Sequence, residues 1–269
     1  MTEVADYIDD IKKFKVIDVH MHLGVTSNVY YYNYNDEKVI NLQKKFNVKK
    51  SLCSHCVGFS SLDNQMDEIY KLVDKFGDFI CWYLIYDPHY PQKSLDIIDK
   101  NKDKINFAGI KIHPVFHETR LDDKAYYPLW EYVIQNDIVV LSHTWSPYTE
   151  SPKQFLSNPL LVENVLTKFE ELKFIVGHGG GKIPFYSEVI ELLKRHNNLY
   201  VEFAGDTLYP KIFRRVIDEV GSKRVLFGTD MPMIDIRYHL ISVFKADLTN
   251  EERGNIFYNN AVQLFKFDK

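Results

Sequence analysis

The segment Val16-Ile17-Asp18-Val19-His20-Met21-His22 places two histidines, one residue apart, directly after an apolar run. Residues i and i+2 of an extended strand point to the same side, so His20 and His22 can present both imidazoles to one ion. A strand that is apolar until its tip is typical of a parallel sheet whose carboxyl ends hold the chemistry. Taken alone, the pair equally fits two histidines that hydrogen-bond in a loop. Asp18 would share the side of His20, deeper along the strand, where we expect it either to have a structural role or to support a ligand residue.

Short apolar runs recur along the chain, and longer amphipathic stretches lie between them. The runs cover residues 14–20, 50–56, 79–85, 107–113, 138–143, 173–178, 199–203 and 224–230. Helical patterns cover residues 62–76, 122–136, 160–171, 184–196 and 208–220. This alternation predicts an α/β protein, a (β/α)₈ TIM barrel that forms a single domain over residues 1–269. The alternative is a doubly wound open sheet, but no Gly-x-Gly-x-x-Gly follows the first run.

Composition narrows the class of protein. The chain has 269 residues, 45% of them apolar, and a formal net charge of −4, which favours neither nucleic acid nor an anionic membrane as a partner. We find no basic start followed by an apolar core and no apolar run long enough for a membrane span, so we expect a cytoplasmic protein. Three cysteines are too few for a disulfide framework; Cys53 and Cys56 have a C-x-x-C spacing, but without a second pair we expect core residues.

Several expected strands end in a residue that can bind metal or carry a proton. These residues are His20, His22, Lys111, His113, His143, His178 and Asp230. In a barrel all strand ends meet at one face, and only ten of the 269 residues are histidine, so this placement is not a chance event. Imidazole nitrogens and carboxylate oxygens are ligands of Zn²⁺ and similar divalent ions. The sequence therefore predicts a divalent metal site.

The motifs that carry these residues resemble those of the amidohydrolase superfamily. They are Ile17-Asp18-Val19-His20-Met21-His22, Gly109-Ile110-Lys111-Ile112-His113-Pro114, Leu141-Ser142-His143, Val176-Gly177-His178-Gly179-Gly180, Leu226-Phe227-Gly228-Thr229-Asp230-Met231-Pro232 and Asn260-Ala261-Val262-Gln263-Leu264-Phe265. Within the superfamily they are similar to the amidohydrolase 2 branch of metal-dependent barrels, which includes mononuclear hydrolases, lactonases and non-oxidative decarboxylases.

The resemblance implies the roles of the ring residues. His20, His22, His143 and Asp230 would hold one divalent ion, for which we expect Zn²⁺ with Mn²⁺ as the alternative, and His178 and Asp230 would be catalytic. In two-metal members a carbamylated lysine at the position of Lys111 bridges the metals and His178 is a ligand; we favour one metal. Barrels of this kind are often homodimers.

Further residues are candidates for binding a small-molecule substrate. Lys111 lies between Ile110 and Ile112 and should face inward with them, and an arginine after the fourth strand could clamp a carboxylate bidentately. The candidates are Lys111, His113, Arg120, Trp145 and His55. Each ring residue also has an ordinary alternative: Lys111 a solvated charge, His178 a turn residue, Asp230 a helix N-cap.

The chemistry that we expect first is hydrolysis of an amide, a lactone or another carboxylic ester. A bound ion would activate water, and His178 or Asp230 would take up its proton. The alternative is non-oxidative decarboxylation of an unsaturated or aromatic acid, in which a histidine or aspartate protonates the carbon. An aromatic-walled pocket with an arginine clamp would favour the decarboxylase, and a small polar pocket the hydrolase. More remote alternatives are a catalytically silent metal- or ligand-binding barrel and a non-haem iron enzyme.

Overall fold

The computed structural model describes residues 9–25, 34–149, 151, 153–207 and 209–267. One sheet contains eight strands in chain order, and every neighbouring pair is parallel. The strands are β1 (Val16–Leu23), β2 (Val48–His55), β3 (Ile80–Ile85), β4 (Phe107–Ile112), β5 (Val140–Ser142), β6 (Phe174–Val176), β7 (Leu199–Glu202) and β8 (Val225–Leu226). The predicted (β/α)₈ barrel is confirmed.

The segment after β8 returns to β1 and closes the barrel. Val19 N donates to Phe227 O at 2.9 Å, and Asp230 N donates to His20 O at 2.7 Å. Met21 and Met231 form a parallel bridge. The chain just before and at Asp230 is thereby fixed beside the histidines of β1.

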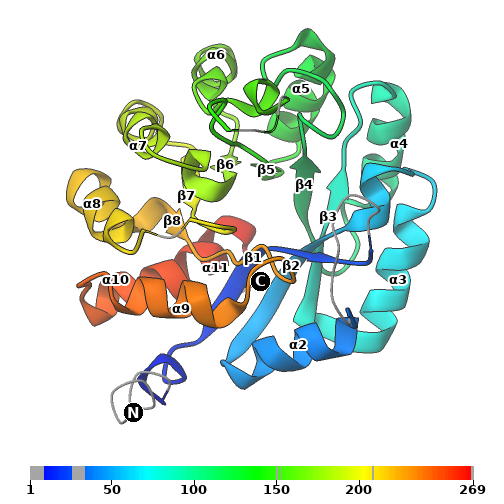
Figure 1. The fold of residues 1–269 in the computed structure, drawn as a ribbon. Helices are drawn as coiled ribbons and strands as arrows, with labels where there is room; N and C mark the ends of the chain where they lie inside the picture. Colours follow the sequence, from blue (N-terminus) through cyan, green and yellow to red (C-terminus); the bar gives the residue numbers. More distant parts are fainter. Residues whose placement is uncertain (1–8, 26–33, 150, 152, 208, 268–269) are drawn as a thin grey trace.

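Helices surround the strands in chain order, as Figure 1 shows. They are α2 (Asp36–Lys45), α3 (Gln65–Phe76), α4 (Pro91–Asn101), α5 (Tyr127–Gln135), α6 (Leu161–Lys168), α7 (Phe185–Arg195), α8 (Lys211–Val220), α9 (Ile236–Phe244), α10 (Asn250–Gly254) and α11 (Asn260–Phe265). Each helix predicted from the sequence contains an observed one. Within the described residues, no helix has the length and apolarity needed to span a bilayer.

The apolar core has two parts. The larger part packs the strands against the surrounding helices. The smaller part fills the barrel interior at its amino-terminal end, which we call the floor; its residues in the strands, or directly before a strand in the case of Val139, are Ile17, Val19, Leu52, Cys81, Tyr83, Ala108, Val139, Leu141, Ile175 and Leu226. Helix α11 packs Ala261, Val262 and Leu264 into the same cluster and is anchored by Asn260 Nδ2, which donates to Val225 O at 2.8 Å. The interior is therefore packed below the carboxyl ends of the strands, which we call the mouth.

A bulge in β1 turns its histidines toward the interior. Asp18 pairs with Ser51 and Met21 with Cys53, so β1 advances by three residues while β2 advances by two. Val19 packs in the inner cluster, whereas Met21 packs in the outer one, and the extra residue lets His20 follow Val19 into the interior.

Because of the bulge, Asp18 and His20 lie on different sides of β1, so the prediction that they share a side is wrong. The Asp18 carboxylate accepts from Gln43 Nε2 of α2 at 2.7 Å, from Thr229 Oγ1 at 2.6 Å and from the backbone N–H of His20 at 3.1 Å. Asp18 thus ties β1 to the surrounding helix and to the segment after β8, which is a structural role.

The last predicted strands are longer than the observed ones, because polar residues that we included in them lie in the turns beyond. His143, His178 and Asp230 follow β5, β6 and β8. His178 and Asp230 have left-handed backbones, with φ of 59° and 61°. This conformation is uncommon for residues other than glycine, and here it occurs in the turns beyond the strands, where both side chains face the mouth.

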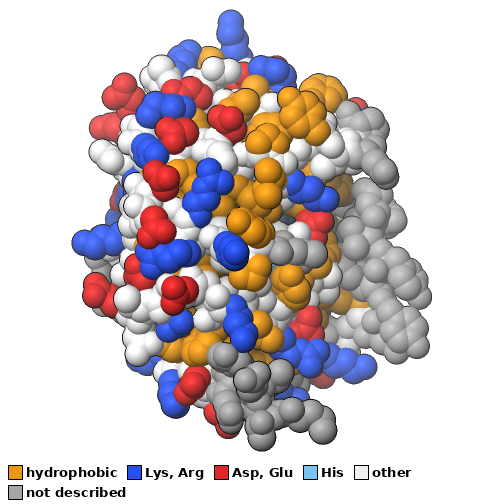
Figure 2. All heavy atoms as spheres, turned by 60° about the vertical axis from the view of Figure 1, so that its left-hand side comes forward, with side chains coloured by type: hydrophobic (Ala, Val, Ile, Leu, Met, Phe, Trp, Pro, Cys, Tyr) orange, Lys and Arg blue, Asp and Glu red, His pale blue; other side chains and the backbone are white. Residues whose placement is uncertain are grey.

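Charges of both signs are mixed on the surface that Figure 2 brings forward. Ion pairs between neighbouring helices account for part of this mixing; Lys194 Nζ of α7 lies 2.7 Å from Glu219 Oε2 of α8. A band of apolar side chains runs beside the charged area.

Candidate metal centre

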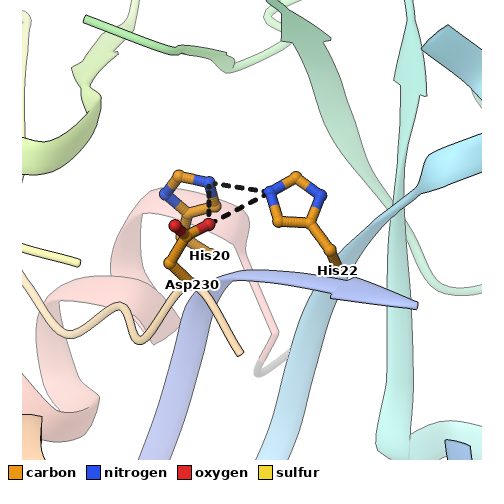
Figure 3. Close-up of side chains that lie close together, drawn as sticks. All are labelled: His20, His22 and Asp230. Atoms are coloured by element: carbon orange, nitrogen blue, oxygen red, sulfur yellow. Dashed lines mark hydrogen bonds and ion pairs between the residues drawn. The ribbon is translucent and has the colours of Figure 1, made fainter. Parts of the chain in front are cut away.

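His20, His22 and Asp230 converge at the mouth of the barrel (Figure 3). Asp230 Oδ1 lies 3.2 Å from His22 Nε2 and 3.5 Å from His20 Nε2, and the two Nε2 atoms are 3.3 Å apart. All three residues are buried. Two imidazole nitrogens and a carboxylate oxygen therefore point at one small volume.

Hydrogen bonds on the outer side of the rings fix the tautomers of His20 and His22. His20 Nδ1 donates to Glu202 Oε1 at 2.8 Å, and His22 Nδ1 donates to the backbone oxygen of Ser54 at 3.1 Å. With the proton on Nδ1, each Nε2 keeps its lone pair for the centre.

His143 and His178 are held in the same way. His178 Nδ1 donates to Ala204 O at 3.1 Å, and His143 Nε2 donates to Gln154 Oε1 at 3.2 Å. The inward nitrogens, His178 Nε2 and His143 Nδ1, are 3.1 Å apart. Four imidazoles thus have one nitrogen tied to an acceptor and the other facing the mouth.

The expected ligand His143 does not reach the first three residues as closely as they reach one another. The close groups of ligand atoms among the described residues are His20, His22 and Asp230, and His20, His178 and Glu202. His143 contacts these groups through His178, whose Nε2 lies 3.1 Å from His143 Nδ1. His143 follows β5 and His178 follows β6, and both imidazoles face the centre.

Electrostatics keep His20 and His143 neutral and the Asp230 carboxylate charged. Burial, reinforced by neighbouring cationic groups, lowers the pKa of His20 and His143 well below the usual range. Burial alone would raise the pKa of Asp230, but the hydrogen bond to His22 and the adjacent histidines outweigh it and hold this pKa far below its ordinary value. Neutral imidazoles and an ionised carboxylate are the protonation states that metal binding requires.

Lys111 lies inside this set. Its side chain is fully buried, and Nζ donates to His20 Nε2 at 2.7 Å. Burial lowers the pKa of this ammonium to about 8.

Sequence reasoning missed two residues that hold the imidazoles, Glu202 and Gln154. Glu202 ends β7 with no exposed surface; Oε1 accepts from His20 Nδ1 and from the backbone N–H of His178, and Oε2 accepts from the backbone N–H of Ala204. An acid at the end of the apolar run 199–203 is a signal that could have identified it. Gln154 lies in the loop after β5, and nothing in its sequence context indicates its contact with His143.

A cavity of about 370 Å³ opens above these groups. His113 stacks on His143, with ring centroids 4.1 Å apart and planes 7° apart, and Trp145 is nearly parallel to His143 at 10°. Phe59 and Phe116 contact the His113 ring edge-on, at 5.6 Å in each case. The lining is mostly aromatic and apolar, and it includes the substrate candidates Lys111, His113 and Trp145.

The structure places Arg120 and His55 elsewhere. The expected carboxylate clamp Arg120 is half exposed and makes a bidentate pair with Asp122 through Nε at 2.7 Å and Nη2 at 2.8 Å, because this acid lies only two residues farther along. His55 Nδ1 accepts from Val57 N at 3.3 Å, and its ring packs against Gly24 rather than lining the cavity.

Comparisons with known proteins extend over nearly the whole chain. A family model described as amidohydrolase matches residues 17–267. The chain is 21% identical over 240 residues to a 2-keto-4-carboxy-3-hexenedioate hydratase of Sphingobium sp., which covers 73% of this chain and 69% of that protein. It is 21% identical over 246 residues to a gamma-resorcylate decarboxylase of Polaromonas sp., covering 76% of this chain and 74% of that protein.

A solved structure shares the fold. It is a dihydroxybenzoic acid decarboxylase of Polaromonas sp. with bound manganese and the inhibitor 2-nitroresorcinol. The TM-score is 0.74 at 16% identity, and the match covers 95% of this chain and 98% of that one.

Proposed function

The chain belongs to the amidohydrolase family, and from this premise we propose that it is a metal-dependent, non-oxidative decarboxylase of an unsaturated or aromatic carboxylic acid. Hydrolysis was the first expectation from the sequence. The relatives favour the alternative, since the Polaromonas relatives described above are named as decarboxylases and the Sphingobium relative as a hydratase.

The observation that carries the proposal is the wall of the cavity. A hydrolase of small polar esters or amides would need a small polar pocket, whereas Phe59, Phe116 and Trp145 line this one together with the stacked rings of His113 and His143. Aromatic side chains favour a flat, unsaturated substrate, which they contact through stacking and edge-to-face packing.

The donor set fits a divalent ion, which we assign to His20, His22, His143 and Asp230. The outer hydrogen bonds leave every one of these imidazoles with an inward lone pair, and Asp230 is ionised. Manganese in the Polaromonas relative makes Mn²⁺ as good a candidate as Zn²⁺. When bound, such an ion supplies a positive charge that orients the oxygen atoms of the substrate and stabilises negative charge on them.

Lys111 would bind the substrate carboxylate. Its Nζ donates to the His20 lone pair that a metal ion would take, so metal binding frees this ammonium to donate to an anion at the bottom of the cavity. In this proposal Lys111 binds the substrate carboxylate, the role that we expected for Arg120 from the sequence.

His178 would hold the proton that the reaction consumes. Its Nδ1 is fixed by Ala204 O, and Nε2 faces the cavity. A proton on Nε2 passes to the substrate carbon that bears the carboxylate; the bond from that carbon to the carboxylate then breaks, its electron pair returns to the unsaturated system, and CO₂ leaves. Solvent restores the proton.

The test is CO₂ release from hydroxylated benzoates, such as 2,6-dihydroxybenzoate, by protein loaded with Mn²⁺ or Zn²⁺. We expect one metal per chain and stoichiometric CO₂ and decarboxylated product. Turnover of lactones, esters or amides without CO₂ release from any acid would contradict the proposal.

His178→Ala separates proton transfer from metal binding. We expect this variant to keep about one metal per chain while turnover falls by about 10²- to 10⁴-fold, the usual contribution of a proton-transfer group. Loss of stoichiometric metal would instead make His178 a ligand, as its proximity to His20 and Glu202 allows.

A further inference from the structure

We infer that the substrate carries a single carboxylate, and that its other end is flat and uncharged. This inference rests on the proposed function and specifies its substrate. It separates this chain from the Sphingobium relative, whose name describes a compound with three carboxyl groups.

The first support is the distribution of charge in the cavity. Among the described residues that line it, Lys111 is the sole lysine or arginine, and it lies at the bottom beside His20. Residues 26–33, 150, 152 and 208, which lie outside the described part of the chain, contain no lysine or arginine. One anionic group of the substrate can therefore be paired within this chain, together with the metal.

The rim of the cavity carries an acid instead of a base. Asp206 lines it, and this carboxylate lies 3.6 Å from Lys182 Nζ. Lys182 is half exposed, lies 5.9 Å from the centre of the Trp145 ring, and is not part of the lining. The charges of Asp206 and Lys182 offset each other. A substrate carboxylate at the rim would therefore face Asp206 and have no lysine or arginine to pair with.

The second support is the apolar upper wall. Phe59, Phe116, Trp145, Met233 and Ile234 line the cavity, and none of these side chains is charged. A carboxylate placed against them would lose hydration and gain no cationic partner, which is unfavourable. An aromatic ring gains contact there, and a cavity of about 370 Å³ is suited to one ring with small substituents.

The experiment measures binding of two unreactive probes, benzoate and isophthalate, to metal-loaded protein by calorimetry. The probes differ by one carboxylate. We expect benzoate to bind and isophthalate to bind at least about tenfold more weakly, the effect of an unpaired charge in an apolar site. Equal or tighter binding of isophthalate would overturn the inference, and so would the absence of benzoate binding.

A variant with a new base makes the test independent of the wild-type affinities. Met233 is partly exposed and lines the cavity, so Met233→Lys places an ammonium against the substrate's far end. We expect it to raise the isophthalate-to-benzoate affinity ratio by about tenfold. Met233→Leu, the matched control, should keep the wild-type ratio; an unchanged ratio in Met233→Lys would overturn the inference.

This result and the proposed function can fail separately. Binding of the unreactive probes does not depend on CO₂ release. A benzoate preference without any decarboxylation would leave the inference standing and remove the proposed reaction, whereas CO₂ release from a dicarboxylate that binds tightly would do the opposite.

Discussion

The two ends of the barrel interior are equally buried but chemically opposite. The floor is filled by apolar side chains such as Leu52 and Ile175, which no water reaches. The mouth, a few residues farther along the same strands, buries His20, Lys111 and Glu202. Apolar burial stabilises the fold by about 25 cal/mol per Å². Buried polar groups cost stability unless each one has a partner, so the floor is built for folding and the mouth for chemistry.

The largest effect expected from this contrast is a separation of stability from metal binding. His20→Ala removes a central donor, and we expect it to lose stoichiometric metal and detectable turnover while the apo protein loses less stability than Leu52→Ala does. Leu52→Ala at the floor should lower the free energy of unfolding by about 2–5 kcal/mol through the cavity that it leaves. Its folded fraction should still bind one metal.

Elemental analysis and denaturant unfolding of the apo proteins measure both quantities. If His20→Ala destabilised the apo protein as much as Leu52→Ala, the mouth would contribute to folding as the floor does. The contrast between the two ends would then be lost.

The same contrast explains how much could be predicted from the sequence. The floor and the strand order follow from apolar runs of regular spacing, so the barrel was predictable. His20, His22, His178 and Asp230 could be brought together in advance because barrel strands all end at one face.

What the sequence did not reveal depends on contacts between distant segments. The bulge in β1 adds one residue relative to β2, and a strict alternation of sides cannot anticipate it. Arg120 has an acid within reach in its own loop, which decides its direction locally. Gln154 reaches His143 only through the path of a loop. The choice between hydrolysis and decarboxylation depends on the cavity wall, which loops from several strands build together.

The next largest effect is a dependence of the free energy of unfolding on pH, caused by a buried histidine. His239 of α9 is buried, its Nε2 has no hydrogen-bond partner in the described structure, and burial lowers its pKa to about 4. In the unfolded chain a histidine has a pKa near 6.5, so between pH 6.5 and pH 4 the unfolded chain binds more protons than the folded one. The stability that neutral His239 permits is therefore fully present above about pH 6.5 and is lost as the pH drops toward 4. For a shift of this size the loss at pH 4 is about 3 kcal/mol.

Unfolding of the apo protein at pH 7 and pH 4, compared with His239→Leu, isolates this contribution. The variant should lose about 3 kcal/mol less between the two values than the wild type. Leu52→Ala, by contrast, should be weakened by the same amount at both. Parallel pH curves for the wild type and His239→Leu would show that His239 is not held neutral by the fold.

The smallest effect tests whether the partners of the mouth position the ligands or merely fill space. The Glu202 carboxylate accepts from three donors, His20 Nδ1 and the backbone N–H groups of His178 and Ala204. In Glu202→Gln one acceptor oxygen becomes a donor, so a donor is left unpaired and His20 loses its fixed orientation at almost unchanged volume. We expect metal affinity, measured by competition with a chelator, to fall by about 10- to 100-fold. Glu188→Gln on the exposed face of α7 is the matched control and should leave the affinity unchanged. Unaltered metal affinity in Glu202→Gln, with lowered stability, would reduce Glu202 to a packing residue and make the mouth resemble the floor.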